Sequence, residues 1–261
     1  MSVAPFFLLL LVSTPAAVTP PSTTTPTSTP RDADVLARLD RLHQRRDEPE
    51  AQHEARRLAE AAVAAAPNDY ATLWRAARVL FTDSDDPSRP SDERSRLGKQ
   101  AYDLAERAIA VNPNDVAGHY WAALSIGSYA EGMGVVRALA NGIEGKFKRP
   151  LERATALDVK YDHGNIPVVW AAYYLELPWP KRDRARASRE LERALQINPA
   201  NLRARLYQAR IAIDEDRPDA AKKLLAEIAA APANRYDPPE ERRVQSDAAT
   251  LGATLLKIPG K

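Results

Sequence analysis

The stretch AERAIAVNPND at residues 105–115 returns in similar form four more times along the chain. Each copy is rich in helix-forming residues, and in four of the five copies a proline stands at the same place near the end. Proline stops a helix, so this phrase marks the point where one helical unit ends and the next begins. The other copies are AEAAVAAAPND (59–69), LERATALDVKY (151–161), LERALQINPAN (191–201) and LLAEIAAAPAN (224–234).

Small residues return at fixed distances from the closing position, which Pro67, Pro113, Pro199 and Pro232 occupy and Val159 fills in the third copy. A small side chain lets two helix backbones approach closely, so these positions predict antiparallel helix pairs that stack on one another. Five residues before it stand Ala62, Ala108, Ala154 and Ala194, and ten residues after it stand Ala77, Ala123 and Ala209, with Ala172 in the same role if three residues are inserted around 163–165.

This pattern resembles the tetratricopeptide (TPR) repeat family, whose unit has about 34 residues. The resemblance implies an all-α fold, a right-handed α-solenoid of helix-turn-helix repeats over residues 31–234. A final segment, 235–261, contains an amphipathic stretch from Pro239 to Lys257 that predicts a C-terminal capping helix and a tail. His43 departs from the family pattern, since a small residue is usual there. The expected units are 36–69, 70–115, 116–161, 162–201 and 202–234.

The N-terminus holds an apolar run, APFFLLLLV from Ala4 to Val12, followed by small residues. It is too short to span a bilayer and is typical of a signal peptide, which we place at 1–17, although no lysine or arginine precedes it. The alternatives are an unstructured tail or an uncleaved anchor. A Thr/Pro/Ser-rich linker follows at 18–30. We therefore expect an exported protein, periplasmic or secreted, with no membrane span once the signal is removed.

A narrower resemblance rests on the long segment from Tyr129 to Leu157 and on the phrase YYLELPWP at 173–180. These features look like two groups of repeat proteins. One is the periplasmic repeat component of tripartite ATP-independent (TRAP) transporters, and the other is the mitochondrial microtubule-dynamics regulator family. With an export signal, the sequence favours the periplasmic group.

The composition and motifs of this chain do not indicate catalysis, metal binding or nucleic-acid binding. With 37 basic and 35 acidic residues the formal net charge is +2, so no strong field attracts nucleic acid. Cysteine is absent, the four histidines are never three or four residues apart, and no phosphate-binding or nucleophile motif occurs. We expect no enzyme activity, metal or cofactor. Residues 82–93 are interpreted as a solvated acidic loop; a cation site at Asp83, Asp85 and Asp86 is the alternative.

Aromatic residues and arginines stand where the first helix of such a repeat faces the concave inner surface. These residue types commonly anchor protein partners. An alternative interpretation places several of them, Trp170 among them, in the core between units. Leu177 to Pro180 (LPWP) is expected to fix a turn, with partner binding as its alternative, and 181–193 a solvated basic helix face. The candidate partner-binding residues are Trp74, Arg78, Tyr120, Leu124, Tyr129, Trp170, Tyr173 and Arg210.

The sequence thus favours a non-enzymatic scaffold or adaptor of the cell envelope that holds another protein or a peptide segment in its groove. The rival hypothesis is a periplasmic solute-binding component of a TRAP-type transporter. In that case a pocket lined by Tyr120, Tyr129, Trp170 and Tyr173 would take a small apolar ligand.

Overall fold

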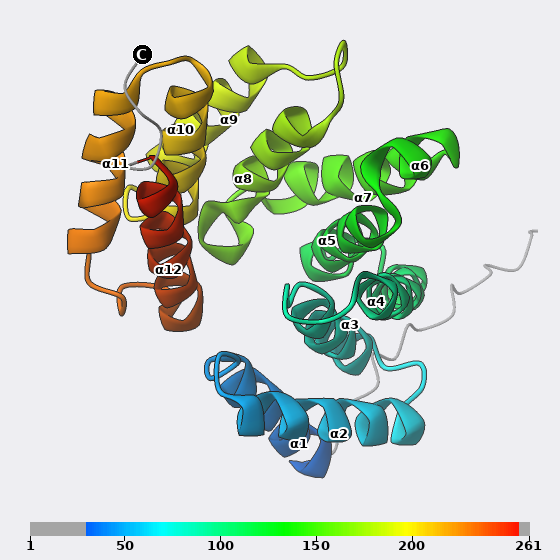
Figure 1. The fold of residues 1–261 in the computed structure, drawn as a ribbon. Coiled ribbons are helices and arrows are strands. Elements are labelled where there is room, and N and C mark those ends of the chain that lie inside the picture. Colours follow the sequence, from blue (N-terminus) through cyan, green and yellow to red (C-terminus); the bar gives the residue numbers. More distant parts are fainter. Residues whose placement is uncertain (1–29, 256–261) are drawn as a thin grey trace, which may run out of the picture.

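The structure is a computed structural model that describes residues 30–255 (Figure 1). The predicted signal peptide, and all of the linker but Pro30, lie outside these residues. Within the described range the chain is helical and has no β-strand, which confirms the predicted all-α class. The helices are α1 (Pro30–His43), α2 (Pro49–Ala65), α3 (Tyr70–Ser84), α4 (Ser91–Val111), α5 (Val116–Met133), α6 (Val135–Ala140), α7 (Ile143–Asp158), α8 (Tyr161–Glu176), α9 (Arg184–Ile197), α10 (Leu202–Asp214), α11 (Pro218–Ala230) and α12 (Pro238–Leu255).

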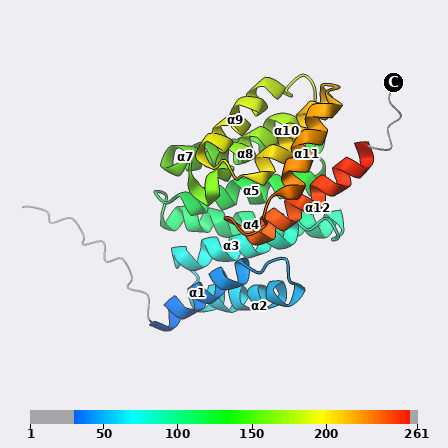
Figure 2. The ribbon, with the colours of Figure 1, turned by 90° about the vertical axis from the view of Figure 1, so that its left-hand side faces the viewer.

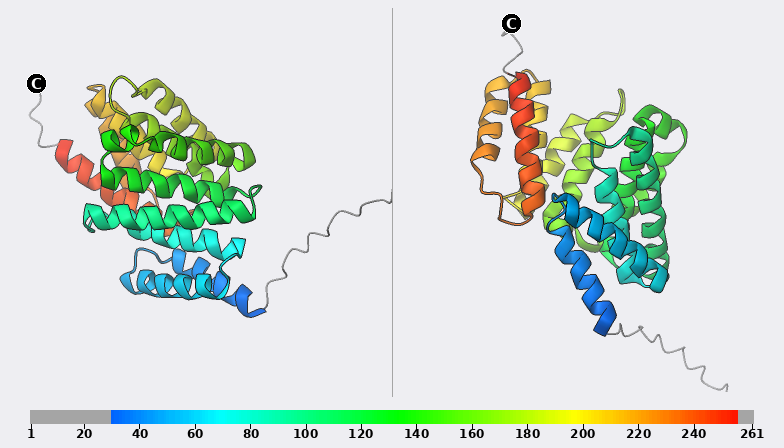
Figure 3. Two further views of the ribbon diagram at one scale, coloured as in Figure 1. Left: turned by 90° about the vertical axis from the view of Figure 1, so that its right-hand side faces the viewer. Right: turned by 60° about the horizontal axis from the view of Figure 1, so that its bottom comes forward.

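The helices pack as successive pairs that form the predicted α-solenoid (Figure 2). The pairs are α1–α2, α3–α4, α5–α7, α8–α9 and α10–α11, and α12 packs against both helices of the last pair. The path curves so strongly that α12 comes to lie opposite α1, as the right-hand view of Figure 3 shows. The first helices of the later pairs therefore face a common centre.

The repeated phrase acts through its last residue as well as through its proline. Asp69 accepts a hydrogen bond from the backbone N–H of Thr72 at 2.7 Å, and Asp115 accepts one from Ala117 at 3.0 Å. Asn201 does the same for Ala204 at 2.9 Å. Such side chains satisfy N–H groups that a helix start leaves free, so these three copies of the phrase end one helix and cap the next.

Most of the recurring alanines occupy the contacts between helices, while Ala62 of α2 is only partly buried. Ala77, Ala108, Ala123, Ala154, Ala194 and Ala209 are all fully buried. In α8, however, Ala171 is the fully buried alanine, and the predicted Ala172 is only partly buried and lines the central cavity.

The reason for this shift is a left-handed turn at the start of α8. Asp162, His163 and Gly164 have φ angles of 52°, 58° and 81°. Ala171 stands twelve residues after Val159, so this turn adds two residues to the ten of the other units and not the expected three. A side chain at Gly164 would also meet Ile197 Cγ2 at 2.8 Å, so glycine is required there on two grounds.

The last helix covers the apolar end of the array. Val244 and Ala248 of α12 are buried against Leu202 and Leu206 of α10 and Ile228 of α11. This arrangement is the predicted capping helix, and it removes an apolar face from water.

Candidate functional site

A cavity of about 810 Å³ lies at the centre of the superhelix. Its volume falls in the range of about 300–1,000 Å³ that is typical of protein ligand sites. Helices α5 to α8 contribute a mainly apolar wall that includes Trp121, Leu124, Leu139, Ile143, Phe147 and Val169. Helices α10 and α12, the turn after α1 and the end of α3 contribute a charged wall that includes Arg46, Asp85, Arg203, Arg210, Asp237, Glu240, Arg243 and Asp247.

Four of the eight candidate residues line this cavity: Tyr120, Leu124, Tyr173 and Arg210. The hydroxyl of Tyr173 donates to Glu144 Oε1 at 2.6 Å, and its ring stacks on Phe147 with centroids 5.2 Å apart. Lys181 and Tyr173 both donate to the Glu144 carboxylate and hold its pKa below the usual range. Tyr173 therefore presents a fixed, partly exposed ring to the cavity.

Tyr120 lines the same cavity but is far less accessible, because only 2% of its surface is exposed. Its hydroxyl donates to Asp162 Oδ2 at 2.6 Å, which joins α5 to the left-handed turn of α8. Burial raises the pKa of Tyr120 well above its usual value, and the Asp162 charge raises it further. Tyr120 thus supports the wall more than it offers contact area.

The structure places the other four candidates outside the cavity, because their side chains lie between helices. Arg78 is buried and donates to Asp40 Oδ1 at 2.7 Å, and it lies over the ring of Trp74. The indole of Trp170 donates to Thr155 Oγ1 at 3.0 Å within the core. Tyr129 packs against the same core. The expected concave positions of Trp74, Arg78, Tyr129 and Trp170 need correction, and the predicted ligand pocket loses two of its four aromatic residues.

His43, the residue that departs from the family pattern, is partly buried. Its ring packs edge-on against Trp121 at 6.1 Å, where it lines the cavity. Burial lowers its pKa well below the ordinary value of 6.5, and the nearby charges of Arg78 and Arg46 lower it further. In the family pattern a small residue is usual at this position, so the presence of a histidine there was the feature of the sequence that could have pointed to a special role.

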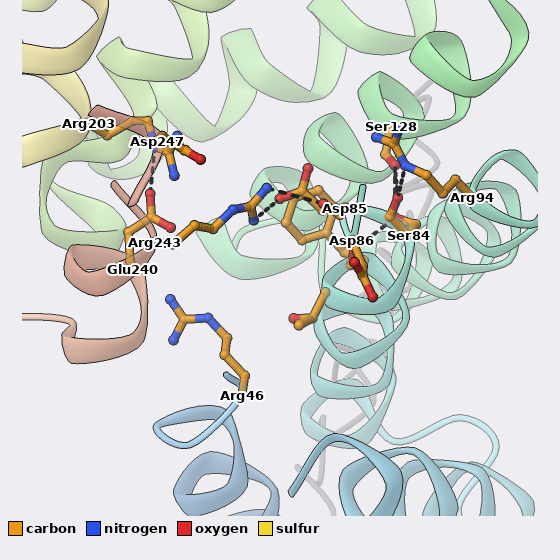
Figure 4. A network of polar contacts seen from close by, with 12 residues as sticks. Arg46, Ser84, Asp85, Asp86, Arg94, Ser128, Arg203, Glu240, Arg243 and Asp247 are labelled. Atoms are coloured by element: carbon orange, nitrogen blue, oxygen red, sulfur yellow. Dashed lines mark hydrogen bonds and ion pairs between the residues drawn. The ribbon is translucent and has the colours of Figure 1, made fainter. Parts of the chain in front are cut away.

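Ion pairs join the two ends of the superhelix across the cavity. Arg46, in the turn after α1, pairs with Asp237 just before α12 at 2.6 Å, and Arg242 pairs with Asp47 at 2.7 Å. Arg243 reaches from α12 to the carboxylate and the carbonyl oxygen of Asp85, as Figure 4 shows. These partners are 158 to 195 residues apart in the sequence, which is why sequence patterns gave no sign of them.

Further polar contacts hold the charged wall in place. Arg203 of α10 pairs with Glu240 and Asp247 of α12, both at 2.8 Å. Burial acts to raise the pKa of Glu240, but the adjacent Arg203 outweighs it and lowers that pKa. On the other side, Ser128 donates to the hydroxyl of Ser84 at 2.9 Å (Figure 4). The wall is therefore preorganised by its own contacts.

The solvated loop expected at 82–93 is shorter, because residues 82–84 end α3 and residues 91–93 begin α4. The carboxylates of the alternative cation site contact arginines. Asp83 is buried and pairs with Arg56 at 3.2 Å and Arg89 at 3.5 Å, while Asp85 faces Arg243. Over residues 30–255 no cluster of histidines and carboxylates has the arrangement that a metal ion needs. In the same part of the chain, no helix combines the length and apolarity required to cross a membrane.

The stacked helix pairs, the capping helix and the central cavity define a TPR-type repeat protein. A solved structure of a thermophilic TPR protein from Thermus thermophilus superposes with a TM-score of 0.60 at 17% identity, covering 86% of this chain and 98% of that one. Within that class, the chain belongs to the family described as Regulator of microtubule dynamics protein 1-3, whose family model matches residues 35–255.

Relatives with that name come from mammals. Regulator of microtubule dynamics protein 1 of Bos taurus is 29% identical over 116 residues, and that of Pongo abelii is 31% identical over 117. Each alignment spans 44% of this chain and 36% of the relative. The match therefore spans just over a third of the length of these relatives.

These relatives overturn the predicted location. An exported, periplasmic or secreted protein was expected from an apolar run that lacks preceding basic residues, and this prediction is wrong, because the family and its matched relatives are regulators of microtubule dynamics. The cell-envelope setting and the association with a TRAP-type transporter depended on that location and have no support. Of the two narrower resemblances, the microtubule-dynamics regulator family is the correct one.

Proposed function

We propose that this chain is a non-enzymatic interaction scaffold that holds a segment of another protein in its central cavity. The observation that carries the proposal is the cavity of about 810 Å³, with an apolar wall on one side and a charged wall on the other. A partner segment with one apolar and one polar side would bury both against matching surfaces. TPR-type folds generally serve protein–protein interaction, which supports the same function.

The cavity offers contacts of two kinds. Leu124 and the stacked Tyr173–Phe147 pair give rigid apolar area that loses little entropy on binding. Arg210 and Glu176 also line the cavity, both are exposed, and within residues 30–255 neither is in an ion pair. Their charges can pair with a partner without first breaking an internal ion pair, although the Arg210 guanidinium lies 5.3 Å from the ring centroid of Tyr207.

The test compares a blocked cavity with an altered outer face. Leu124→Arg inserts a long charged side chain into the apolar wall, while Arg96→Glu changes an exposed residue of α4 outside the cavity. Because the family name refers to microtubule dynamics, polymerised tubulin is the first partner to test by co-sedimentation. We expect binding with the wild type and Arg96→Glu, and loss of at least about tenfold in affinity with Leu124→Arg.

If tubulin does not co-sediment, the same three proteins serve as baits for affinity capture. A partner retained by the wild type and Arg96→Glu, and lost by Leu124→Arg, supports the proposal. Equal capture by all three would contradict a role for the cavity. The melting temperatures of the variants are compared first, so that unfolding is not mistaken for loss of binding.

A small apolar ligand is the second candidate, favoured by the apolar wall around Leu139, Ile143 and Phe147. Native mass spectrometry of the purified chain distinguishes the two. If the wild type carries extra mass that is absent from the Leu124→Arg variant, a small bound ligand is favoured. If the wild type carries no extra mass but captures a partner protein, the scaffold is favoured.

A further inference from the structure

Trp179 is the most exposed large apolar residue in the described part of the chain, with 89% of its surface accessible. It stands at the tip of the turn between α8 and α9. The backbone N–H groups of Lys181 and Arg182 donate to the carbonyl of Pro178 at 2.9 and 3.3 Å, and buried Leu177 anchors the base of the turn. The phrase Leu177 to Pro180 thus forms the expected turn, and within it the side chain of Trp179 is left exposed to water.

A stripe of arginines begins next to this turn. Helix α9 buries Ala187, Leu191 and Ala194 against its neighbours. Arg186, Arg189 and Arg193 follow one another at spacings of three and four residues, which places them along one side of the helix, turned from the buried face. Arg182 lies in the turn just before the helix. All four are exposed. No residue of α9 lines the central cavity, so the stripe belongs to the outer side of the solenoid.

Few ion pairs occupy these arginines, although Arg182 Nε donates to the carbonyl of Leu177 at 3.2 Å and the Arg186 guanidinium lies 5.7 Å from the ring centroid of Tyr174. Over residues 30–255, no carboxylate lies within ion-pair distance of Arg182 or Arg189. Arg186 pairs with Asp183 at 3.3 Å and Arg193 with Glu190 at 3.8 Å. Ion pairs between exposed side chains are worth about 0–1 kcal/mol, so a partner can replace them at little cost.

We propose that Trp179 and the arginine stripe 182–193 form a second docking surface, which takes an acidic polypeptide segment of a partner protein. Guanidinium groups bind carboxylates through paired hydrogen bonds, and tryptophan and arginine are the residue types that dominate binding energy at interfaces. Arg186 to Arg193 span about 10 Å of α9 at 1.5 Å per residue. An extended segment of about three residues covers that distance at 3.3 Å per residue, so alternate acidic side chains reach successive arginines, and a further apolar residue on the side of the turn contacts the indole.

The observations favour a polypeptide over other anionic partners. A chain with a formal net charge of +2 lacks the broad positive field that recruits nucleic acid. The stripe is narrow and ends in a single exposed aromatic ring, whereas a membrane surface needs a wide basic face with several inserted side chains. This surface is separate from the cavity, so the two proposals can fail independently.

The experiment titrates the full chain into a fluorescein-labelled peptide of alternating glutamate and leucine and follows its anisotropy. The double variant Arg182→Glu/Arg189→Glu is expected to weaken binding by about tenfold or more, and so is Trp179→Ala. The matched control is Arg57→Glu/Arg96→Glu, which makes the same charge change at exposed arginines of α2 and α4 that also lack an ion pair in the described residues. We expect the control to stay within about twofold of the wild type.

The peptide should also change the emission of the wild type, and this change should vanish in Trp179→Phe. Leu124→Arg should bind the peptide as tightly as the wild type, which separates this surface from the cavity. Equal weakening by the two double variants, or full binding by Trp179→Ala, would overturn the proposal. So would binding to single-stranded DNA or phosphatidylserine vesicles with none to the peptide.

Discussion

Arg46 donates a hydrogen bond to Oδ2 of Asp237 across 2.6 Å and so joins two residues that are 191 positions apart. With the pairs Arg242–Asp47 and Arg243–Asp85, it holds α12 against the beginning of the superhelix. Helix α12 packs against α10 and α11, but over the described residues it makes no comparable helix packing with α1, α2 or α3. The closure therefore consists of ionic side chains, and its strength depends on salt.

Removal of either partner should weaken this closure. The Arg46–Asp237 pair is mostly shielded, with side-chain exposures of 17% and 9%. We expect Arg46→Ala and Asp237→Ala each to lower the free energy of unfolding by roughly 1–3 kcal/mol, between the values for exposed and buried pairs. The double variant should lose little more than the worse single variant, since the two residues act together. Urea unfolding of all four proteins measures this, and fully additive losses would argue against a direct coupling.

The same closure should open in strong salt. At about 1 M salt the screening length falls to about 3 Å, while apolar packing within the helix pairs is not weakened. We expect the radius of gyration from small-angle X-ray scattering to increase between low and high salt with unchanged helix content by circular dichroism. The Asp237→Ala variant should begin closer to the expanded value. A radius independent of both salt and substitution would contradict an ionic closure.

The contact between α4 and α5 sets a limit on side-chain size. A methyl group at Gly98 would lie 2.8 Å from the backbone nitrogen of Tyr129 and 3.1 Å from the carbonyl oxygen of Ser125. Gly98→Ala should therefore force the helices apart and cost about 1–3 kcal/mol in unfolding free energy. The control is Gly145→Ala in α7, where no atom lies within 4 Å. That change should stabilise by roughly 0.5–1 kcal/mol, so thermal unfolding should show opposite signs.

Ala123 tests the alanine pattern itself. It is fully buried in α5, so Ala123→Leu should overpack the contact and cost about 1–3 kcal/mol. Ala64→Leu, at an exposed position of α2, introduces the same side chain with little effect. If both variants melt at the temperature of the wild type, the packing role of Ala123 is refuted.

His43 should make stability depend on pH. Its pKa lies well below 6.5 in the folded chain, so below about pH 6.5 the unfolded chain binds a proton that the folded chain does not. Stability from this residue is complete above pH 6.5 and falls as the pH is lowered toward the folded pKa. Between about pH 7.5 and 5.5 the loss should be on the order of 1 kcal/mol.

Comparison of variants isolates this contribution. In the His43→Gln variant, the loss of unfolding free energy between about pH 7.5 and 5.5 should be smaller by the contribution of His43. The His53→Asn variant, changed at an exposed histidine of α2, should show the same loss as the wild type. Identical pH profiles for the wild type and His43→Gln would contradict the assignment.

The fold could be predicted because its determinants are local and repeated. A proline that stops one helix, a capping residue two positions later and an alanine ten positions after the proline recur along the chain, and each acts within its own pair. Ala172 shows the limit of this reasoning. The insertion was expected to be three residues long, but the left-handed turn at Asp162 to Gly164 adds only two, so the buried position is Ala171.

The site could be predicted only in part, because a helix has several faces. Tyr173 and Arg210 line the cavity, as their spacing predicted. The side chain of Arg78 instead donates to Asp40 of α1 and lies between the helices. The closing ion pairs connect residues that are neighbours only after the superhelix has curved through all its units. No periodic signal records such a contact, so Arg46 and Arg243 could not have been singled out from the sequence.

Helix α12 also has a consequence for how such a protein can change over evolution. Open solenoids lengthen by duplicating units, because each new unit stacks on an unoccupied apolar end. Here Val244 and Ala248 fill that end, and the same helix carries the arginines that meet Asp47 and Asp85 on the far side. An added unit would have to displace α12 and would break the ion pairs that close the superhelix. The size of the central cavity therefore depends on the present number of helix pairs.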